Sequence, residues 1–234
     1  MRIFVVGNIN ARKTHLVKQL KKLFPKYKVL SIDEYRKKYA DGSLEKELAT
    51  RQMFADSIIN EERAIIEFSG GDTITNLFID RLRTNSFIIL EVDEEVEICI
   101  DRIKEKDFTV IPYPKFSESL ENTIIRLDKE FKNDMIDKNF NHKYLKKYVI
   151  DHGKPIDNLP FKQYELCIDI SKYFFDNNKT LFSFGSLGRG DMNQYSDLDL
   201  FLLTGDNVHE VEKLVRKKYP DAEYIIQGTQ IAIF

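Results

Sequence analysis

Short apolar runs and longer amphipathic stretches alternate along the chain between residues 1 and 150. Apolar runs without polar alternation are typical of strands that are buried on both faces. Apolar residues spaced three and four apart in the intervening stretches predict helices with one buried face. The predicted strands span 2–7, 28–32, 64–69, 86–92 and 144–150, and the predicted helices 15–24, 45–61, 94–106 and 120–138. This alternation predicts an α/β fold with a parallel sheet and flanking helices.

The pattern changes after residue 150. Segment 151–160 holds the densest cluster of turn-forming residues in the chain, which predicts a boundary between domains. We therefore predict two domains, residues 1–152 and residues 158–234, the second a small α+β domain. The elements predicted in this second domain are a strand over 180–184, a strand over 198–203, a helix over 208–218 and a strand over 222–226.

Two acidic residues flank the start of the apolar strand 198–203. Asp197 and Asp199 occupy alternate positions, so their side chains lie on the same face of the strand. Neighbouring carboxylates repel each other unless a cation lies between them, and oxygen ligands of this kind suit Mg²⁺. Upstream, Gly185 lets the backbone approach a phosphate, Ser186 adds a hydroxyl and Arg189 adds a planar cation. This layout predicts a site for a nucleoside triphosphate and magnesium; the alternative is a solvated loop beside two surface acids.

Gly185-Ser186, Arg189-Gly190 and Ser196-Asp197-Leu198-Asp199 together resemble the minimal nucleotidyltransferases of the DNA polymerase beta-like superfamily. That superfamily includes antibiotic nucleotidyltransferases and the nucleotidyltransferase halves of toxin–antitoxin pairs. The resemblance covers residues 161–234 and implies transfer of a nucleoside monophosphate from a triphosphate to a hydroxyl with two magnesium ions. It implies that Gly185 and Ser186 hold the triphosphate and that Asp197 and Asp199 hold metal. The acceptor classes left open are a nucleoside, a sugar, a nucleic-acid end and a protein.

The same resemblance implies a third carboxylate on a later strand of the sheet. Glu223, in the predicted strand 222–226, is the favoured candidate for this catalytic and metal-binding role. Asp221 is the competing candidate, although it follows Pro220 and has the context of a turn residue. The third carboxylate would either bind the first metal or act as general base, and Arg189 would offset charge on the leaving phosphates.

A second phosphate-binding pattern lies at the start of the chain. The phosphate-binding loop motif is G-x-x-x-x-G-K-[ST], placed between a strand and a helix. Gly7, Lys13 and Thr14 match it in that context, and only Arg12 departs, in place of the second glycine. Lys13 would reach the outer phosphates of ATP and Thr14 would bind magnesium. Arg12 either adds a cation to this site or marks a loop that has lost kinase activity.

Residues 1–150 resemble the P-loop small-molecule and polynucleotide kinases. The resemblance implies that Asp33 orients the acceptor hydroxyl with Arg36 near the acceptor, and that Glu67 lies near the magnesium. For Asp33 a helix N-cap is the compatible structural interpretation. Segment 102–114 is a candidate basic lid, but for Arg102 we favour the solvated end of a helix.

Composition limits the partners, the cysteine chemistry and the cellular location that we expect. With 36 Lys and Arg against 38 Asp and Glu, the net charge of −2 gives no electrostatic argument for a nucleic-acid partner. Cys99 and Cys167 lie in apolar stretches with no disulfide or zinc spacing, so both are predicted to be buried. No apolar stretch approaches the ~20 residues needed to cross a bilayer, and no signal peptide is seen, so we expect a cytoplasmic protein without a membrane partner.

Three functions are consistent with these patterns. The favoured one is a magnesium-dependent nucleotidyltransferase fused to an ATP-binding, kinase-like domain. The second is a regulatory or antitoxin-like module whose first domain only binds nucleotide or a partner. The third is an ATP-dependent kinase with an inactive transferase domain.

Overall fold

The computed structural model describes most of the chain and divides it into two compact units, Met1–Lys154 and Pro155–Phe234. The described residues are 1–104, 111–112, 118–151, 155–176, 181–183, 185–202, 208–218, 220, 224–227 and 230–233.

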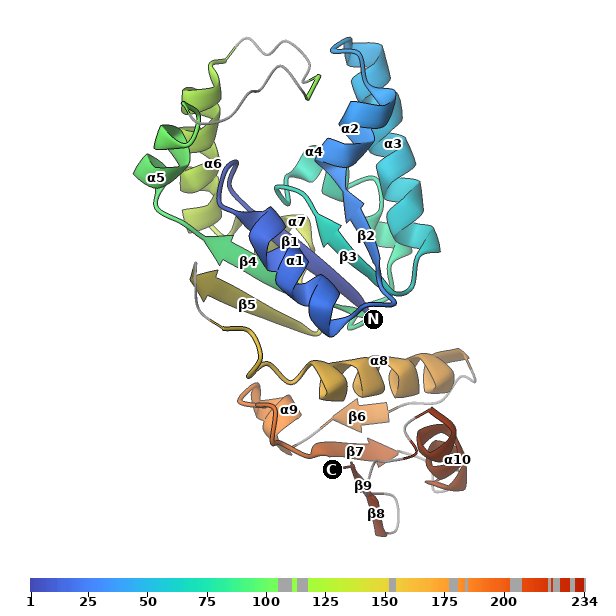
Figure 1. The fold of residues 1–234 in the computed structure, drawn as a ribbon. Coiled ribbons are helices and arrows are strands. Elements are labelled where there is room, and N and C mark those ends of the chain that lie inside the picture. Colours follow the sequence, from blue (N-terminus) through green and yellow to red (C-terminus); the bar gives the residue numbers. More distant parts are fainter. Residues whose placement is uncertain are drawn as a thin grey trace. The chain divides into compact units, whose positions relative to one another are not determined.

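The first unit is built on a five-stranded parallel sheet with strand order β2-β3-β1-β4-β5. The strands are β1 (Arg2–Gly7), β2 (Lys28–Ser31), β3 (Ala64–Glu67), β4 (Phe87–Asp93) and β5 (Lys146–Asp151). In the central strands nearly every side chain is buried, because helices cover both faces of the sheet. Figure 1 shows α1 crossing β1. The predicted α/β fold with a parallel sheet is therefore confirmed.

The helices of this unit are α1 (Lys13–Leu23), α2 (Ile32–Tyr39), α3 (Leu44–Asn60), α4 (Asp72–Thr75), α5 (Val96–Asp101), α6 (Leu120–Lys132) and α7 (Met135–Asn139), with a short 3-10 helix at Ile79–Arg81. The four predicted helices of this unit are found with different ends, and α2, α4 and the short 3-10 helix were not predicted. The predicted helix 120–138 is wrong as one element, because Asp134 takes a left-handed backbone conformation with φ 58° between α6 and α7. The predicted helix 94–106 is too long, since α5 ends at Asp101.

An aromatic cluster forms the centre of the core on one face of this sheet. The ring centroid of Phe4 lies 5.1–6.3 Å from those of Phe68, Phe78, Phe87 and Phe140. All five side chains are almost completely buried, and α3 and α7 pack against the cluster. Burial of a phenylalanine side chain contributes about 1.5–3 kcal/mol, so this cluster is a major source of stability.

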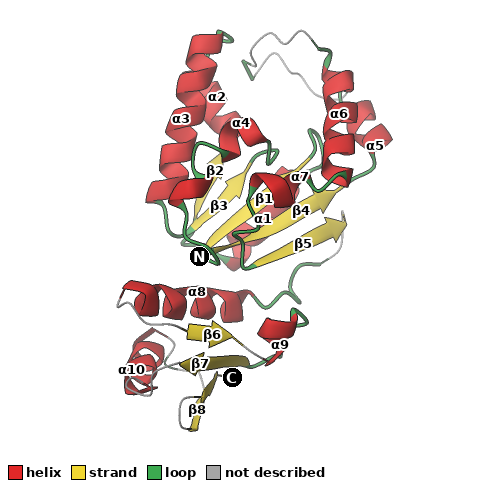
Figure 2. Cartoon of the chain, turned by 180° about the vertical axis from the view of Figure 1, so that it is seen from behind, coloured by secondary structure: helices red, strands yellow, loops and turns green. Residues whose placement is uncertain are grey.

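The second unit contains an antiparallel sheet with strand order β6-β7-β9-β8. Its elements are α8 (Phe161–Asp176), β6 (Leu181–Ser183), α9 (Gly185–Arg189), β7 (Leu198–Leu202), α10 (Val208–Lys218), β8 (Tyr224–Gln227) and β9 (Gln230–Ile233). Figure 2 shows α8 beside β6. The helix 208–218 begins and ends where it was predicted, whereas β9 was not predicted.

Two further observations concern the chain as a whole. Cys99 and Cys167 are both buried and unbridged, as predicted. Burial raises the pKa of the Cys99 thiol to about 11. Of the helices in the described part of the chain, none is long and apolar enough to cross a membrane.

Candidate functional site

The paired aspartates of the second unit lie at the start of β7. Leu198 and Leu200 are completely buried, so strand alternation places Asp197 and Asp199 together on the opposite, partly exposed face. On its two sides β7 pairs with β6 and β9, which fixes the position of Asp199 within the sheet. The two carboxylates therefore share one face, as the spacing predicted.

Gly185 packs directly against the carboxylate of Asp199. A Cβ built on Gly185 would lie 2.9 Å from Asp199 Cγ and would overlap its Oδ2. The φ of Gly185 is +60°, a conformation that L side chains rarely adopt. Only glycine allows the turn after β6 to approach this carboxylate so closely.

Ser186 and Arg189 lie on the short helix α9 that follows this glycine. Ser186 Oγ is buried and has no hydrogen-bond partner among the described residues. A buried hydroxyl without a partner costs free energy, and a bound phosphate oxygen would satisfy it. Arg189 is exposed and pairs with Asp191 through Nε and Oδ2, 3.2 Å apart.

The electrostatics of Asp199 fit a cation. Burial raises the pKa of Asp199, the negative charge of Asp197 raises it further, and Arg189 lowers it in part. A carboxylate whose charge is destabilised by burial and by a neighbouring carboxylate is suited to bind Mg²⁺. Among the residues that the structure describes, no group of three or more potential metal ligands occurs. Glu223 and its competitor Asp221 lie outside the described residues.

The loop that matches the phosphate-binding motif connects β1 to α1 in the first unit. At Gly7 φ is +151°, and a Cβ there would lie 2.7 Å from the carbonyl oxygen of Val92. Arg12 has φ 58° and ψ 27° at the position where the motif has its second glycine. The loop therefore adopts a left-handed conformation at Arg12 in spite of its side chain.

Lys13 and Thr14 are the first two residues of α1. The side chain of Lys13 points to the loop, and that of Thr14 points to β3. Lys13 Nζ donates to the carbonyl oxygens of Gly7 and Asn8 at 3.1 and 2.6 Å. Thr14 Oγ1 donates to Oε1 of Glu67 at 2.6 Å, and Glu67 is the last residue of β3. The structure thus brings together a lysine, a threonine hydroxyl and a carboxylate, the groups that the motif needs for phosphate and magnesium.

Two buried asparagines in this loop were missed by the sequence analysis. Asn8 Nδ2 donates to the carbonyl oxygen of Ile124 in α6 at 2.9 Å, and Asn10 Nδ2 to that of Cys99 in α5 at 3.1 Å. Both amides therefore anchor the loop to helices about 90 residues or more away in sequence. The only sequence feature that could have indicated a role for Asn8 and Asn10 is their location within the phosphate-binding motif, between Gly7 and Lys13.

Arg102 is not the solvated helix end that we predicted. Its side chain is only 13% exposed and forms an ion pair with Glu94 Oε2 at 2.8 Å. It also donates from a terminal guanidinium nitrogen to the carbonyl oxygen of Asn10 at 2.8 Å. The prediction was wrong because the fold brings Asn10, 92 residues away in sequence, and Glu94, from the other end of α5, next to Arg102.

Asp33 lies in the first turn of α2, and the N-cap of this helix is Ser31 rather than Asp33. Asp33 Oδ1 accepts from Arg36 at 3.2 Å, and Arg36 pairs with the buried Glu47 at 2.7 Å. Arg51 also pairs with Glu47, at 2.6 Å. Arg36 is therefore held in place by Glu47 while it contacts the proposed acceptor-orienting carboxylate.

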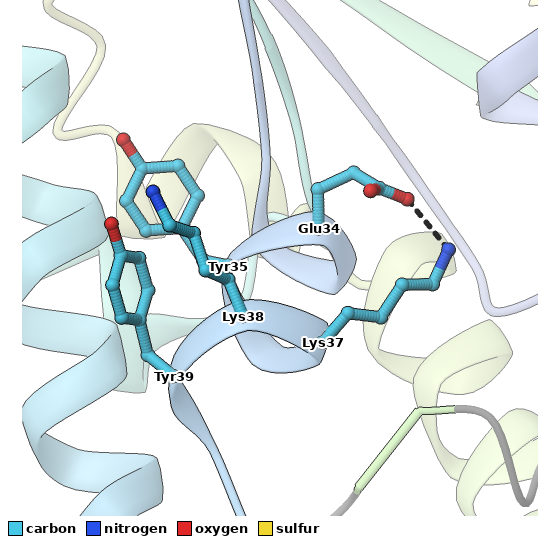
Figure 3. A pocket seen from close by; sticks show the side chains of 5 residues that line it. All are labelled: Glu34, Tyr35, Lys37, Lys38 and Tyr39. Carbon is cyan, nitrogen blue, oxygen red and sulfur yellow. Dashed lines mark hydrogen bonds and ion pairs between the residues drawn. The ribbon is translucent and has the colours of Figure 1, made fainter.

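A surface hollow of about 470 Å³ lies on the same helix (Figure 3). Lys37 Nζ donates to Glu34 Oε1 at 2.6 Å, and Lys38 lies over the Tyr39 ring at 4.9 Å. These side chains already engage one another, so we assign no ligand to the hollow. Its lining residues are Glu34, Tyr35, Lys37, Lys38 and Tyr39.

Comparison with known families supports this description of the second unit. The family model "Nucleotidyltransferase domain" matches residues 166–231. This range includes Gly185, Ser186, Asp197 and Asp199. The second unit thus contains a nucleotidyltransferase domain, which places the chain among the transferases.

Several solved kinase structures are similar to the chain. Shikimate kinase from Acinetobacter baumannii in complex with shikimate is 14% identical, with 75% of this chain and 93% of that chain covered and a TM-score of 0.45. Shikimate kinase from Aquifex aeolicus is 14% identical, with 76% and 98% covered and a TM-score of 0.43. Deoxyadenosine kinase from M. mycoides with products bound is 15% identical, with 74% and 100% covered and a TM-score of 0.40. None of the curated proteins matches the chain.

Proposed function

We propose that the second unit is a magnesium-dependent nucleotidyltransferase that moves a nucleoside monophosphate from a nucleoside triphosphate to an acceptor hydroxyl. The observation that carries this proposal is the packing of Gly185 against Asp199, beside the buried and unpartnered hydroxyl of Ser186. The nucleotidyltransferase match over residues 166–231 supports it.

Asp197 and Asp199 are the proposed magnesium ligands, and Glu223 is the proposed third carboxylate. Bound magnesium would lower the pKa of the acceptor hydroxyl and offset the charge of the triphosphate. Ser186 would donate its hydroxyl hydrogen to a phosphate oxygen, and the missing side chain of Gly185 lets the turn that carries Ser186 lie directly against Asp199.

The reaction forms a bond between the acceptor oxygen and the α-phosphorus and breaks the bond from that phosphorus to the bridging oxygen. Pyrophosphate leaves with the bonding electron pair. The hydroxyl proton passes to a base, for which Glu223 is the proposed group if it does not bind metal. Arg189, close enough to lower the pKa of Asp199, would offset charge on the leaving phosphates.

The decisive experiment supplies ATP labelled at either the α- or the γ-phosphorus, with magnesium and a panel of nucleoside, sugar, RNA and protein acceptors. We expect label from the α position on an acceptor, and a loss of at least about 100-fold in the variant Asp197→Asn/Asp199→Asn. Asp176→Asn, on an exposed residue at the end of α8, is the control and is expected to keep full activity. Transfer from the γ position alone makes the chain a kinase and contradicts the proposal.

A second candidate function belongs to the first unit, as an ATP-binding, kinase-like domain. The contact of Thr14 with Glu67 and the position of Lys13 over the loop support phosphate and magnesium binding there. Asp33 is the proposed acceptor-orienting residue. We expect transfer of label from the γ position that is lost in Lys13→Ala. ATP binding without any such transfer supports the regulatory alternative for this unit.

We also propose that residues 1–152 and 158–234 are separate domains. The division of the chain between Lys154 and Pro155 supports this proposal. Limited proteolysis is expected to cut first within segment 151–160 and to release two resistant fragments.

A further inference from the structure

The loop that joins α9 to β7, residues 190–197, exposes an aromatic side chain beside the proposed transferase site. Tyr195 is 89% exposed, more than any other large hydrophobic side chain in the described part of the chain. One exposed aromatic residue is ordinary on a protein surface. Two other features point to a function: hydrogen bonds hold the backbone of this loop, and the loop lies next to the proposed metal ligands in the sequence.

Hydrogen bonds within the loop hold the backbone on both sides of Tyr195. The Asn193 amide donates to Ser196 Oγ at 2.9 Å, and the Ser196 amide donates back to the Asn193 carbonyl oxygen at 3.0 Å. The Tyr195 amide donates to Asn193 Oδ1 at 2.9 Å. The ring thus stands in solvent on a backbone that these hydrogen bonds support.

The rest of the second unit anchors the same loop. Gln163 of α8 donates through Nε2 to the carbonyl oxygens of Gln194 and Ser196 at 3.0 and 3.1 Å. Met192 is buried, with 6% of its surface exposed. A ligand that binds the Tyr195 ring therefore orders little additional chain, which reduces the entropic cost of binding.

The position of Tyr195 relates it to the proposed metal ligands. It precedes Asp197 by two residues, a span of at most about 7 Å along the backbone. The start and the end of segment 185–199 meet where Gly185 packs on Asp199. A nucleotide whose phosphates lie at Ser186 and the aspartates has its base within reach of the loop.

We propose that Tyr195 is a stacking platform for a nucleobase bound at this site, a role that rests on the proposed nucleotidyl transfer. Stacking of a base on an aromatic side chain is tolerant of base identity, since every base has a π face. The ring would thus bind the base of the nucleoside triphosphate, or that of a nucleic-acid acceptor, with little preference among bases.

The first test uses fluorescence. The chain has no tryptophan, so Tyr195→Trp places a single tryptophan at the proposed platform, and its emission is read with excitation at a wavelength that tyrosine does not absorb. We expect MgATP to quench its emission, magnesium tripolyphosphate to leave it unchanged, and Asp197→Asn/Asp199→Asn in the same background to abolish the quench. N-acetyltryptophanamide in the same solutions corrects for light absorbed by ATP. A short single-stranded RNA replaces ATP in a parallel arm and identifies an acceptor base.

The second test measures affinity by calorimetry in a Lys13→Ala background, which removes phosphate binding at the first unit. Tyr195→Ala is expected to weaken MgATP binding by about 5- to 100-fold while the affinity for magnesium tripolyphosphate stays the same. Tyr195→Phe keeps the ring and is expected to restore the affinity to within about twofold of the parent.

The results of these two tests distinguish a failure of base stacking at Tyr195 from a failure of the proposed transferase site. If tripolyphosphate and ATP both fail to bind through Asp197 and Asp199, the proposed transferase site is wrong. If both bind there but Tyr195→Ala lowers neither the affinity for ATP nor that for RNA, the stacking proposal is wrong. A quench by RNA alone supports the platform and assigns it to the acceptor.

Discussion

Arg12 keeps the backbone conformation that its motif normally obtains from glycine. Its φ of 58° and ψ of 27° are left-handed, a state that costs an L residue roughly 1–2 kcal/mol. The loop tolerates this cost because hydrogen bonds from Asn8 and Asn10 to α6 and α5 hold the segment that precedes Arg12. Folding thus overrides the local preference of this one residue.

The change Arg12→Gly is expected to increase the free energy of unfolding by up to about 1 kcal/mol, because relief of strain exceeds the added freedom of the unfolded chain. Urea denaturation measures this change. Arg12→Ala, which removes the side chain but keeps the strain, should give no gain. If the kinase activity is only impaired, Arg12→Gly should also raise phosphoryl transfer, and a fall in ATP affinity would instead show that the Arg12 cation contributes to binding.

Gly185→Ala tests the close approach at the transferase site. The added methyl group would collide with the carboxylate of Asp199 in a backbone conformation with φ +60°. We expect nucleotidyl transfer to fall by at least about 100-fold and the free energy of unfolding by about 1–3 kcal/mol. Gly71→Ala is the control, because a Cβ there makes only ordinary contact with Ser69 Oγ at 3.4 Å. Transfer activity within a few fold of the parent would show that the turn is not part of the site.

Residues whose chemistry depends on spacing along the chain could be predicted from the sequence. The motif positions of Gly7, Lys13 and Thr14 and the alternation of Asp197 and Asp199 are properties of short segments. The partners of Arg102 could not be predicted. Its contact with Asn10 joins positions 92 residues apart, and no local pattern records such a pairing.

At the scale of elements, a buried ion network joins α2 to α3. Glu47 has no exposed side-chain surface and is held by Arg36 and Arg51. Burial alone would raise the pKa of Glu47, but hydrogen bonds and charge from the two arginines hold it below its ordinary value of 4.5. A carboxyl group with a lowered pKa stabilises the fold fully above its unfolded pKa, and this stability is lost as the pH falls through its folded pKa.

Glu47→Gln is therefore expected to lower the free energy of unfolding at pH 7 by about 3 kcal/mol, since it removes the buried negative charge that pairs with the largely buried guanidinium groups of Arg36 and Arg51. The parent should lose stability as the pH falls below about 4.5 and through the lowered pKa of Glu47, and the variant should lose less over the same range. Urea denaturation at several pH values checks both statements. Glu45→Gln, an exposed change on the same helix, is expected to cost less than about 1 kcal/mol. Parallel acid profiles for parent and Glu47→Gln would exclude this network as a source of acid sensitivity.

The type of most elements could be predicted, while several of their ends could not. Strands β1 and β4 are short apolar runs, which are stable as central strands that are buried on both faces of a sheet. The break between α6 and α7 depends on the left-handed backbone of Asp134, which the amphipathic pattern across residues 120–138 conceals. Strand β9 contains only Gln230–Ile233 and is stabilised by pairing with β7 and β8. A segment this short gives little periodic signal of its own.

At the scale of the whole molecule, each of the two compact units buries apolar side chains of its own. The aromatic core of the first unit is drawn from residues between Phe4 and Phe140, whereas Leu198 and Leu200 are buried within the second unit. In each unit, the strands that contribute these buried side chains also lie next to the proposed phosphate site of that unit. Two such units are expected to unfold as two thermodynamic steps rather than as one.

Differential scanning calorimetry on paired core variants tests this expectation. Phe4→Ala removes the ring at the centre of the aromatic cluster and should destabilise the first unit by about 3–5 kcal/mol. Leu200→Ala removes a completely buried side chain from β7 and should destabilise the second unit by about 2–5 kcal/mol. Each change should lower the temperature of one transition and leave the other in place. A single transition that moves in both variants would show that the two units fold cooperatively, and the two proposed phosphate sites would then share one folding unit.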